Sequence, residues 1–268
     1  MQVYRHFDIG TDKPTKKQQR NVEHYMIDIL EPDQVCNAGE FMQLALNKIE
    51  NIPRDKNIIV TGGTFLYIKA LLNGLLNNME SDPEIRDSLY RTLNDRGKHY
   101  LYKELKRIDP ETASILHPNN YIRVIRAIEI YLITGKKFSE LKNSHNFNQN
   151  RFRTLKVALF NDREKIKNNI NNRVDMMLKK GLIEEVRKIR AMGYGSNIKP
   201  MQSIGYRQIN SYLENEIDLE RAVFLIKRDT RRYAKRQLTW LRKEKDLTWY
   251  NCELETKKII EKGREFFY

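Results

Sequence analysis

The sequence predicts an α/β protein that is mostly helical, with a parallel sheet and crossover helices. Short apolar runs alternate with amphipathic helical segments in the first 76 residues, as in strands that are covered by crossover helices. Helical patterns fill residues 82–143 and return between 161 and 244. A chain of 268 residues can bury a substantial core, in one large domain or two small ones.

The first elements alternate between strand and helix. Residues 25–30, YMIDIL, form a short apolar run suited to a buried strand, and a Glu-Pro-Asp turn signal follows it. Residues 38–52 have apolar side chains at helical spacing. Residues 57–64, NIIVTGGT, predict a second buried strand, and 65–76 return to helix. A third strand is expected within residues 153–160, RTLKVALF.

The middle of the chain is expected to be helical over residues 82–143. Its first helix has a cap at Ser81 or Asp82 and a proline in the first turn. Residues 119–137 predict another helix that stops at Gly135.

Helices are also expected in the C-terminal half. Residues 161–192 predict one or two helices, capped by Asn161 or Asp162 and broken at Gly181. The last long helical stretch covers about 218–244.

The charge of the chain favours a polyanionic partner. The formal net charge is +14, and steering and counterion release both reward such an excess. The alternative is a soluble protein that is merely lysine-rich. The two cysteines, Cys36 and Cys252, form no paired motif, so a disulfide framework or a zinc site is not expected.

No targeting or membrane signal is evident. The first residues lack an apolar secretory core, and no apolar run approaches the ~20 residues of a membrane span. We therefore expect a soluble, cytoplasmic protein.

The most informative segment is 221–245, with ten Lys or Arg and two acids. At 3.6 residues per turn, several cations share one side of a helix: Arg228, Arg231, Lys235 and Arg242. Apolar side chains lie mainly on another side: Ile226, Tyr233, Trp240 and Leu241. One side can then pack while the other follows a phosphate backbone. The alternative is a solvated basic face.

Two further segments are candidates for ligand contact. Gly62-Gly63-Thr64 joins a strand to a helix, where backbone N–H groups can hold an anion, although a simple tight turn is an alternative. In MQSIGYRQ, residues 201–208, Tyr206 could stack on a base and Arg207 could contact phosphate; an ordinary helix start is the alternative.

Arg173 lies at the edge of a polar helix face, from which it could reach a cleft, or it is a solvated arginine. A phosphate-binding loop of the type G-x-x-x-x-G-K-[ST] is absent from the printed sequence. The Gly-Lys pairs at 97–98 and 135–136 have neither the preceding glycine nor the following hydroxyl residue.

Several longer motifs carry a resemblance to a known family. They are MQVYRHFDIGTDKPT, HYMIDILEP, VTGGTFLYIKALLNGL, DPE, HPNNYIRVIRAIEIY, IGYRQ and KRQLTWLRK, in this order. In these motifs the chain resembles tRNA dimethylallyltransferases, also called tRNA isopentenyltransferases, from residue 1 to about 250.

The resemblance implies a P-loop-kinase-like α/β core with a helical insertion. Residues 1–80 and about 145–250 would form the core with its C-terminal helices, about 80–145 the insertion, and 251–268 a tail. It implies transfer of a dimethylallyl group from dimethylallyl diphosphate to N6 of adenosine 37, giving N6-isopentenyladenosine, in tRNAs that read UNN codons. It further implies Mg²⁺ with the diphosphate, the tRNA anticodon stem-loop as partner, no membrane and a monomer.

The resemblance also implies roles for residues at matching positions. Thr64 and Arg173 would be catalytic, with Thr64 beside the target base and Arg173 on the diphosphate. Residues expected at the tRNA are Met1, Gln2, Thr64, Arg86, Ile122, Arg123, Val124, Ile125, Arg126, Gln202, Ser203, Ile204, Gly205, Tyr206, Arg207, Lys235, Arg236, Gln237, Leu238, Thr239, Trp240, Leu241 and Arg242. No metal ligand is expected.

The sequence departs from the family in one respect. Family members begin with a strand, a P-loop, a helix and a strand ending in Asp-Ser, whose aspartate is the presumed general base. Met1-Gln2 would correspond to the residues after that pair, so we expect an incomplete core and an inactive or impaired transferase. Asp8 and Asp12 belong to the D-I-G-T-x-K-P motif and are not obvious substitutes for the base. The alternative function is a catalytically dead protein that still binds tRNA.

Overall fold

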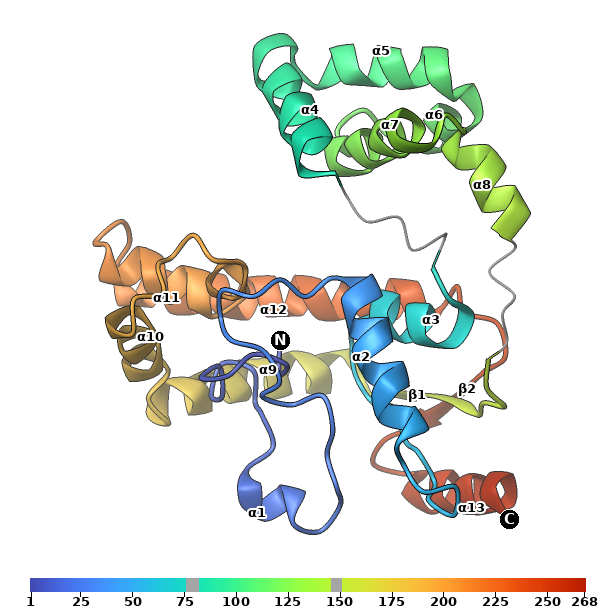
Figure 1. Ribbon diagram of the computed structural model, residues 1–268. Helices are drawn as coiled ribbons and strands as arrows, with labels where there is room; N and C mark the ends of the chain where they lie inside the picture. Colours follow the sequence, from blue (N-terminus) through green and yellow to red (C-terminus); the bar gives the residue numbers. More distant parts are fainter. Residues whose placement is uncertain (76–81, 146–150) are drawn as a thin grey trace. The chain divides into compact units, whose positions relative to one another are not determined.

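The computed structural model describes residues 1–75, 82–145 and 151–268. Over these residues the chain divides into two compact units (Figure 1). One unit comprises Met1–Ile68 and Arg153–Tyr268, and the other comprises Lys69–Phe152. None of the described helices has the length and apolar character that a membrane crossing requires.

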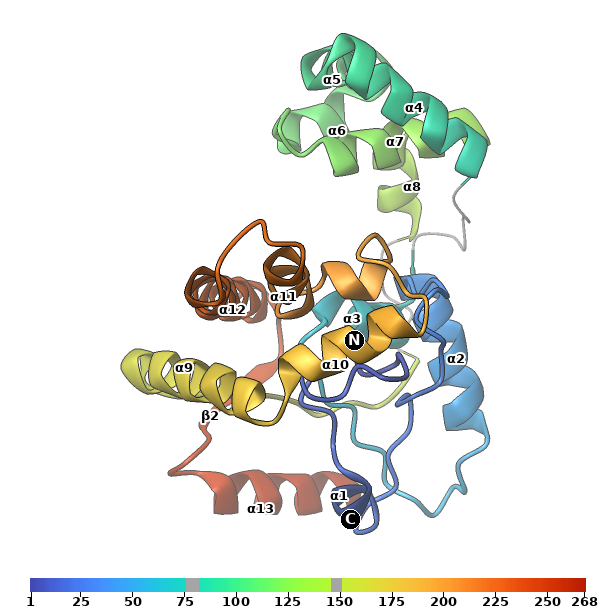
Figure 2. The same ribbon diagram turned by 90° about the vertical axis from the view of Figure 1, so that its left-hand side faces the viewer.

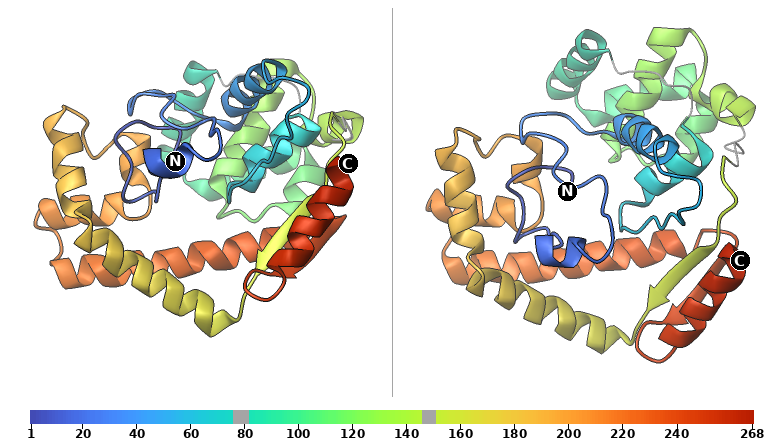
Figure 3. Two further views of the ribbon diagram at one scale, coloured as in Figure 1. Left: turned by 90° about the horizontal axis from the view of Figure 1, so that it is seen from below. Right: turned by 60° about the horizontal axis from the view of Figure 1, so that its bottom comes forward.

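The first unit contains a small parallel sheet and most of the helices. Its elements in chain order are α1 (Lys16–Gln19), α2 (Ala38–Glu50), the start of α3 (Phe65–Asn73), β1 (Lys156–Phe160), α9 (Arg163–Lys179), α10 (Leu182–Ala191), the 3₁₀ turn η1 (Lys199–Gln202), α11 (Tyr206–Leu213), α12 (Leu219–Leu241), β2 (Leu247–Asn251) and α13 (Thr256–Phe267). Helices α9 and α12 are joined at one end by α10 and α11, and β1 and β2 extend from their other ends (Figure 3).

The two strands pair in parallel, with Lys156 opposite Leu247 and Phe160 opposite Asn251. Because the strands are parallel, the end of β1 that leads into α9 and the start of β2 that follows α12 lie at opposite ends of the pair. Helix α13 follows β2 and lies beside the strands (Figure 3).

Of the three strands expected from the sequence, one is confirmed. β1 lies within 153–160, whereas 25–30 and 57–64 contain no strand and the predictions for them are wrong. In the first of these, Met26 and Asp28 adopt positive φ angles of 63° and 53°, which an extended strand does not allow.

The segment 57–64 lacks a strand for a different reason. Its apolar residues are exposed, with Ile59 at 79% and Val60 at 44%, and no described strand lies alongside to accept its hydrogen bonds. An apolar run forms a buried strand only where neighbouring strands and helices cover it.

The predicted helices form, and their caps explain where they begin. At the start of the middle region, Asp82 accepts hydrogen bonds from the backbone of Glu84 and Ile85. Ser81, the alternative cap, lies outside the described residues. Asp162, rather than Asn161, caps α9 in the same way. The stops predicted at Gly135 and Gly181 are confirmed by their φ angles of 68° and 96°, which favour glycine.

The second unit, where it is described, consists of helices. They are the end of α3 and then α4 (Pro83–Arg96), α5 (Lys98–Ile108), α6 (Pro110–Ile115), α7 (Tyr121–Thr134) and α8 (Phe138–His145). Leu89, Leu101, Leu105, Val124 and Ile128 form its core. Asp109 joins α6 to α8 inside this unit, because its carboxylate accepts hydrogen bonds from the backbone and hydroxyls of Thr112 and Ser139.

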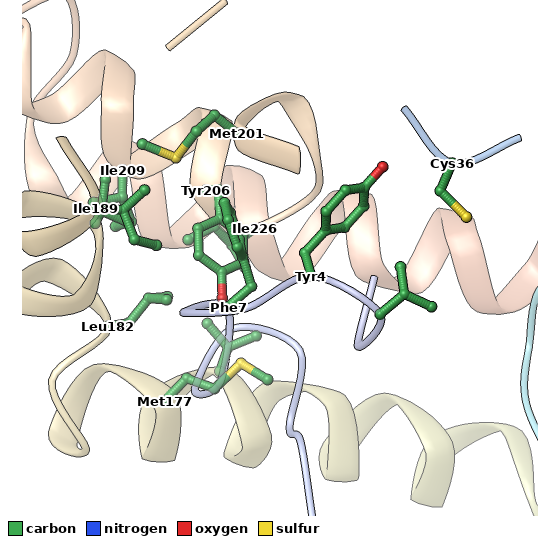
Figure 4. Packing of buried hydrophobic residues seen from close by; sticks show 13 residues of the cluster. Tyr4, Phe7, Cys36, Met177, Leu182, Ile189, Met201, Tyr206, Ile209 and Ile226 are labelled. Atoms are coloured by element: carbon green, nitrogen blue, oxygen red, sulfur yellow. The ribbon is translucent and has the colours of Figure 1, made fainter. Parts of the chain in front are cut away.

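The core of the first unit joins the N-terminal segment to the C-terminal helices. Phe7 packs against Tyr206 with ring centroids 4.7 Å apart, and Ile189, Ile209 and Ile226 surround the pair (Figure 4). Residues far apart in sequence therefore share one apolar cluster, which orders the irregular N-terminal segment.

Candidate functional site

The N-terminal segment is held by a lysine with two carboxylate partners. Lys13 Nζ lies 2.5 Å from both Asp8 Oδ1 and Asp28 Oδ1 and donates to the Tyr4 carbonyl at 2.9 Å. The lysine side chain is only 4% exposed. Asp8 therefore pairs with a buried ammonium group, although its own side chain is 60% exposed.

A second carboxylate fixes the D-I-G part of the same segment. Glu185 of α10 accepts backbone hydrogen bonds from Asp8, Ile9 and Gly10 at 3.0, 2.7 and 3.2 Å. Three successive N–H groups therefore converge on one side chain, and Tyr206 Oη donates a further hydrogen bond of 2.6 Å to the same carboxylate. Burial, followed by the adjacent Glu185 charge, raises the pKa of Tyr206 above its ordinary value, so the phenol keeps its proton.

This arrangement corrects the expected role of Tyr206. The side chain is fully buried between Phe7 and the helices, so its ring does not offer a face to a base (Figure 4). In the IGYR sequence, Tyr206 instead fastens α11 to the N-terminal segment, and the adjacent Arg207 is the exposed member.

The Gly62-Gly63-Thr64 loop is held by α12. Gln237 Nε2 and Tyr233 Oη donate to the Gly63 carbonyl at 3.1 and 3.3 Å. A Cβ added to Gly63 would lie 1.8 Å from Gln237 Nε2, so this glycine allows the helix side chain to approach. Thr64 is exposed at the start of α3, and its carbonyl accepts from the Tyr67 backbone at 2.9 Å.

Arg173 projects from α9 with half of its side chain exposed. Its Nη1 lies 3.6 Å from Asp12 Oδ2, and the Asp12 side chain is 55% exposed. Exposed pairs of this kind contribute little stability, so the guanidinium can exchange Asp12 for another anion.

Helix α12 exposes most of its predicted cations. Lys235, Arg236 and Arg242 are exposed, while Arg231 donates to Asn171 Oδ1 of α9 at 2.8 Å. The apolar residues expected mainly on another side do not all form a packed face, because Tyr233 and Trp240 are 37% and 39% exposed. Of the four apolar residues assigned to that side, Ile226 is the buried one, at 2% exposure.

Asp229 is the buried acid of this basic helix. Its oxygens accept hydrogen bonds from Arg207 Nη2 at 2.6 Å, Gln208 Nε2 at 3.0 Å and Arg228 Nε at 2.9 Å. The partners come from α11 and α12, which lie side by side (Figure 2). Burial opposes ionisation, but the hydrogen bonds from Arg228 and Arg207 outweigh it and hold the pKa of Asp229 below its usual value.

In the second unit, the segment 122–126 divides between surface and core. Ile122 and Arg123 are exposed, whereas Val124 and Ile125 are 1% and 2% exposed and belong to the core. The last two therefore offer no side chain to a ligand. Burial of Val124 and Ile125 fixes the orientation of α7, so that Ile122 and Arg123 face solvent.

A buried carboxylate also organises arginines in this unit. Glu129 of α7 is fully buried, and its Oε2 accepts from Arg86 Nη2 at 2.8 Å and Arg126 Nη1 at 2.9 Å. Both arginines were expected at the tRNA, and they remain 39% and 33% exposed. Sequence periodicity did not reveal Glu129 as the group that holds Arg86 and Arg126, or Asp229 as the group that holds Arg207 and Arg228.

The remaining residues expected at the tRNA vary in exposure. Met1 is 41% exposed, and Gln2 donates to the carbonyls of Thr11 and Asp12. Gln202 is exposed, and Ser203 donates to the Pro200 carbonyl. Gly205 is buried, Thr239 is exposed, and the side chains that are partly covered are Ile204, Leu238 and Leu241.

The described residues contain no group of three or more His, Cys, Asp or Glu side chains that could hold a metal ion. Their chemistry is instead that of exposed guanidinium and ammonium groups, which bind phosphate oxygens by charge-assisted hydrogen bonds.

Comparison with known proteins agrees with this chemistry. The sequence pattern of the IPP transferase family matches residues 2–244. A tRNA dimethylallyltransferase of Citrifermentans bemidjiense is 46% identical over 93% of this chain and 80% of its own length. One from Alkaliphilus oremlandii is 43% identical over 94% and 80%.

Solved structures give the same result. The full-length tRNA isopentenylpyrophosphate transferase of Bacillus halodurans superimposes with a TM-score of 0.69 at 35% identity, covering 99% of this chain and 84% of that one. A eukaryotic dimethylallyltransferase described as acting on tRNA gives a TM-score of 0.80 at 28% identity, with 99% and 71% coverage. These neighbours confirm the α/β fold class, and the chain belongs to the IPP transferase family.

Proposed function

We propose that this protein modifies tRNA by transferring a dimethylallyl group from dimethylallyl diphosphate to N6 of adenosine 37, in tRNAs that read codons beginning with U. The observation that carries the proposal is the family match over residues 2–244, together with relatives that are named tRNA dimethylallyltransferases. The exposed cations of both units support it, because a nucleic-acid ligand needs a basic surface.

In the proposed reaction, N6 of the adenine attacks C1 of the dimethylallyl group. The new C–N bond forms as the C1–O bond breaks, the electron pair leaves with pyrophosphate, and N6 loses a proton. Arg173 would stabilise the departing pyrophosphate, exchanging its loose contact with Asp12 for the diphosphate oxygens. Thr64 would lie beside the adenine, at a loop whose shape Tyr233 and Gln237 maintain.

The adenine must leave the stacked anticodon loop before it can react. The exposed cations of α12 would hold the backbone of the anticodon arm during this step, and Arg86, Arg123 and Arg126 would contact tRNA from the second unit. Because these contacts are mainly to phosphates, the affinity should fall steeply as salt rises.

Magnesium would enter with the diphosphate, whose oxygens are suitable ligands for it. The described residues do not supply a carboxylate cluster for the ion. We therefore assign it no ligand from this chain and derive no step through it.

A second candidate function is tRNA binding without transfer. It is supported by the exposed Lys235, Arg236 and Arg242 of α12, which suit a phosphate backbone whether or not transfer follows.

The test uses labelled dimethylallyl diphosphate and an anticodon stem-loop with adenosine at position 37, beside the same RNA with guanosine there. Transfer to the adenosine RNA only, by this chain or by a version preceded by a relative's P-loop and Asp-Ser segments, supports the enzyme. Binding without transfer in either version supports the second function. Absence of binding to the stem-loop contradicts both.

Arg173 offers a sharper check in whichever version transfers. Arg173→Ala should raise the KM for dimethylallyl diphosphate much more than the Kd for the stem-loop. An equal loss of both would contradict its assignment to the diphosphate.

A further inference from the structure

Asp229 stands out from its sequence surroundings. Between Arg221 and Lys243 it is the single acid among nine cations. It is also one of the few charged residues in the described part of the chain that are buried, at 7% exposure.

The carboxylate of Asp229 joins two helices through their arginines. Oδ2 accepts a hydrogen bond from Arg207 at the start of α11, and Oδ1 accepts one from Arg228 Nε on α12 at 2.9 Å. Arg228 Nη2 lies 2.9 Å from the same Oδ1 as an ion-pair contact. Arg232 adds a longer ion pair of 3.9 Å. Gln208 completes the set with its amide on Oδ2.

Each of these arginines pairs with the buried carboxylate and keeps part of its side chain exposed to solvent. Their side chains are 45%, 33% and 63% exposed for Arg207, Arg228 and Arg232, while the Asp229 side chain is 10% exposed. One carboxylate against three guanidinium groups leaves the cluster with an excess of two positive charges. That excess faces solvent, where a phosphate group could approach.

Stability alone does not account for a buried acid at this position. Replacing a buried ion pair by apolar residues is often neutral or stabilising, because the desolvation of both charges offsets their attraction. Arginine side chains lose conformational freedom when they bind a ligand, and a fixed partner removes part of that loss in advance.

We propose that Asp229 is a positioning residue that holds Arg207 and Arg228 in a preorganised arrangement for backbone phosphates of the tRNA anticodon arm. This inference rests on the proposed function, since the phosphates are those of the same RNA. It adds a residue that contacts no substrate and acts through the two arginines.

The sign of the expected effect separates positioning from simple charge. Asp229→Asn removes a negative charge, so electrostatics alone would strengthen binding to any RNA. Positioning predicts that affinity for the anticodon stem-loop falls about tenfold, within the range of one well-placed nucleic-acid contact, while affinity for a scrambled RNA of equal length does not fall.

Asp175→Asn is the matched control. Asp175 pairs with Lys227 at 2.6 Å across α9 and α12, so its loss changes the net charge equally and also breaks an ion pair on α12. Because it holds neither Arg207 nor Arg228, it should leave the preference for the stem-loop over the scrambled RNA unchanged.

A double-mutant cycle tests whether Asp229 acts through Arg207. In an Arg207→Gln background, Asp229→Asn should change stem-loop affinity less than it does in the wild type. Arg207→Lys keeps the charge at an exposed position, and it should also weaken the preference because lysine lacks the planar fork of the guanidinium group.

The outcomes are distinct. If Asp229→Asn strengthens both RNAs equally, or if Arg207→Lys retains the full preference, the positioning role is overturned and the proposed function stands. Should the wild-type protein itself show no preference for the stem-loop, both inferences fall together. Thermal melting of each variant identifies any loss caused by unfolding. If Asp229→Asn does not fold, full retention of the preference by Arg207→Lys still overturns the positioning role.

Discussion

Replacing Gly10 by alanine should destabilise the protein through one specific clash. A Cβ at Gly10 would lie 2.5 Å from Tyr206 Cε2 and 2.6 Å from Cζ. The ring cannot move aside freely, because Tyr206 is fully buried and packs on Phe7. The backbone N–H of Gly10 also donates to Glu185, so displacement of the segment strains that hydrogen bond as well.

The magnitude follows from these two effects. Overpacking a well-filled core costs about 1–3 kcal/mol. Weakening a hydrogen bond to a charged group adds about 1.5 kcal/mol at the low end of its range. We expect a loss near 3 kcal/mol in the free energy of unfolding, which lowers the Tm by about 6 °C in a protein of this size.

Gly62→Ala is the control for this experiment. A Cβ at Gly62 would have no heavy atom within 4 Å, so its effect should stay within about 0.5 kcal/mol. Both substitutions reduce the freedom of the unfolded chain in the same way, and the difference between them isolates the clash. Urea and thermal unfolding of the two variants measure it. Equal stability of Gly10→Ala and Gly62→Ala would refute the described packing of the N-terminal segment on Tyr206.

Three further predictions concern other parts of the chain. Asp109→Ala should cost about 3 kcal/mol in unfolding free energy, since four hydrogen bonds are lost. Burial opposes ionisation of Asp109, but its hydrogen bonds from Thr112 and Ser139 outweigh this and lower its pKa. The stability of the wild type relative to Asp109→Ala should therefore be greatest above the ordinary aspartate pKa of about 4, and it should shrink as pH falls through the lower pKa of the folded state. A stability difference that does not change with pH would contradict this. Gly63→Ala and Gln237→Ala should each weaken the loop by about 1 kcal/mol and be non-additive in unfolding experiments, because both remove the same hydrogen bond; full additivity would count against that contact. Arg236→Ala and Arg242→Ala should each lower RNA affinity and reduce the slope of log K against log salt by about 1, whereas an unchanged slope in both would make the α12 surface a solvated face only.

Helices could be predicted from the sequence because their signals are local. Caps such as Asp82 and Asp162, and stops such as Gly135 and Gly181, act within a few residues of their position. On α9, apolar residues recur at helical spacing, and two of them, Val174 and Met177, are buried.

Strands were harder to predict because their signals depend on neighbours. Residues 57–60 have strong strand composition, yet no described strand pairs with them. β2 was missed altogether, although Thr248, Trp249 and Tyr250 are residues that favour strands and follow Asp246 at a positive φ of 57°. A five-residue strand between basic segments gives too short a pattern to separate from a loop.

The candidate site could likewise be predicted only in part. The basic character of α12 can be predicted from the sequence, but the role of the carboxylates that hold arginines cannot. Asp229 and Glu129 lie on helices where periodicity alone cannot distinguish a buried acid from a solvated one. The sequence leaves base stacking and an ordinary helix start open for Tyr206, because its burial depends on Phe7, which lies 199 positions earlier in the sequence.

Hydroxyl-radical footprinting of a complete tRNA bound to this protein tests the central claim most directly. We predict that protection is concentrated on the backbone of the anticodon stem-loop, around adenosine 37, and that it disappears as salt is raised. Protection spread evenly along the molecule, or located only in other arms, would contradict the assignment of the basic surface to the anticodon arm.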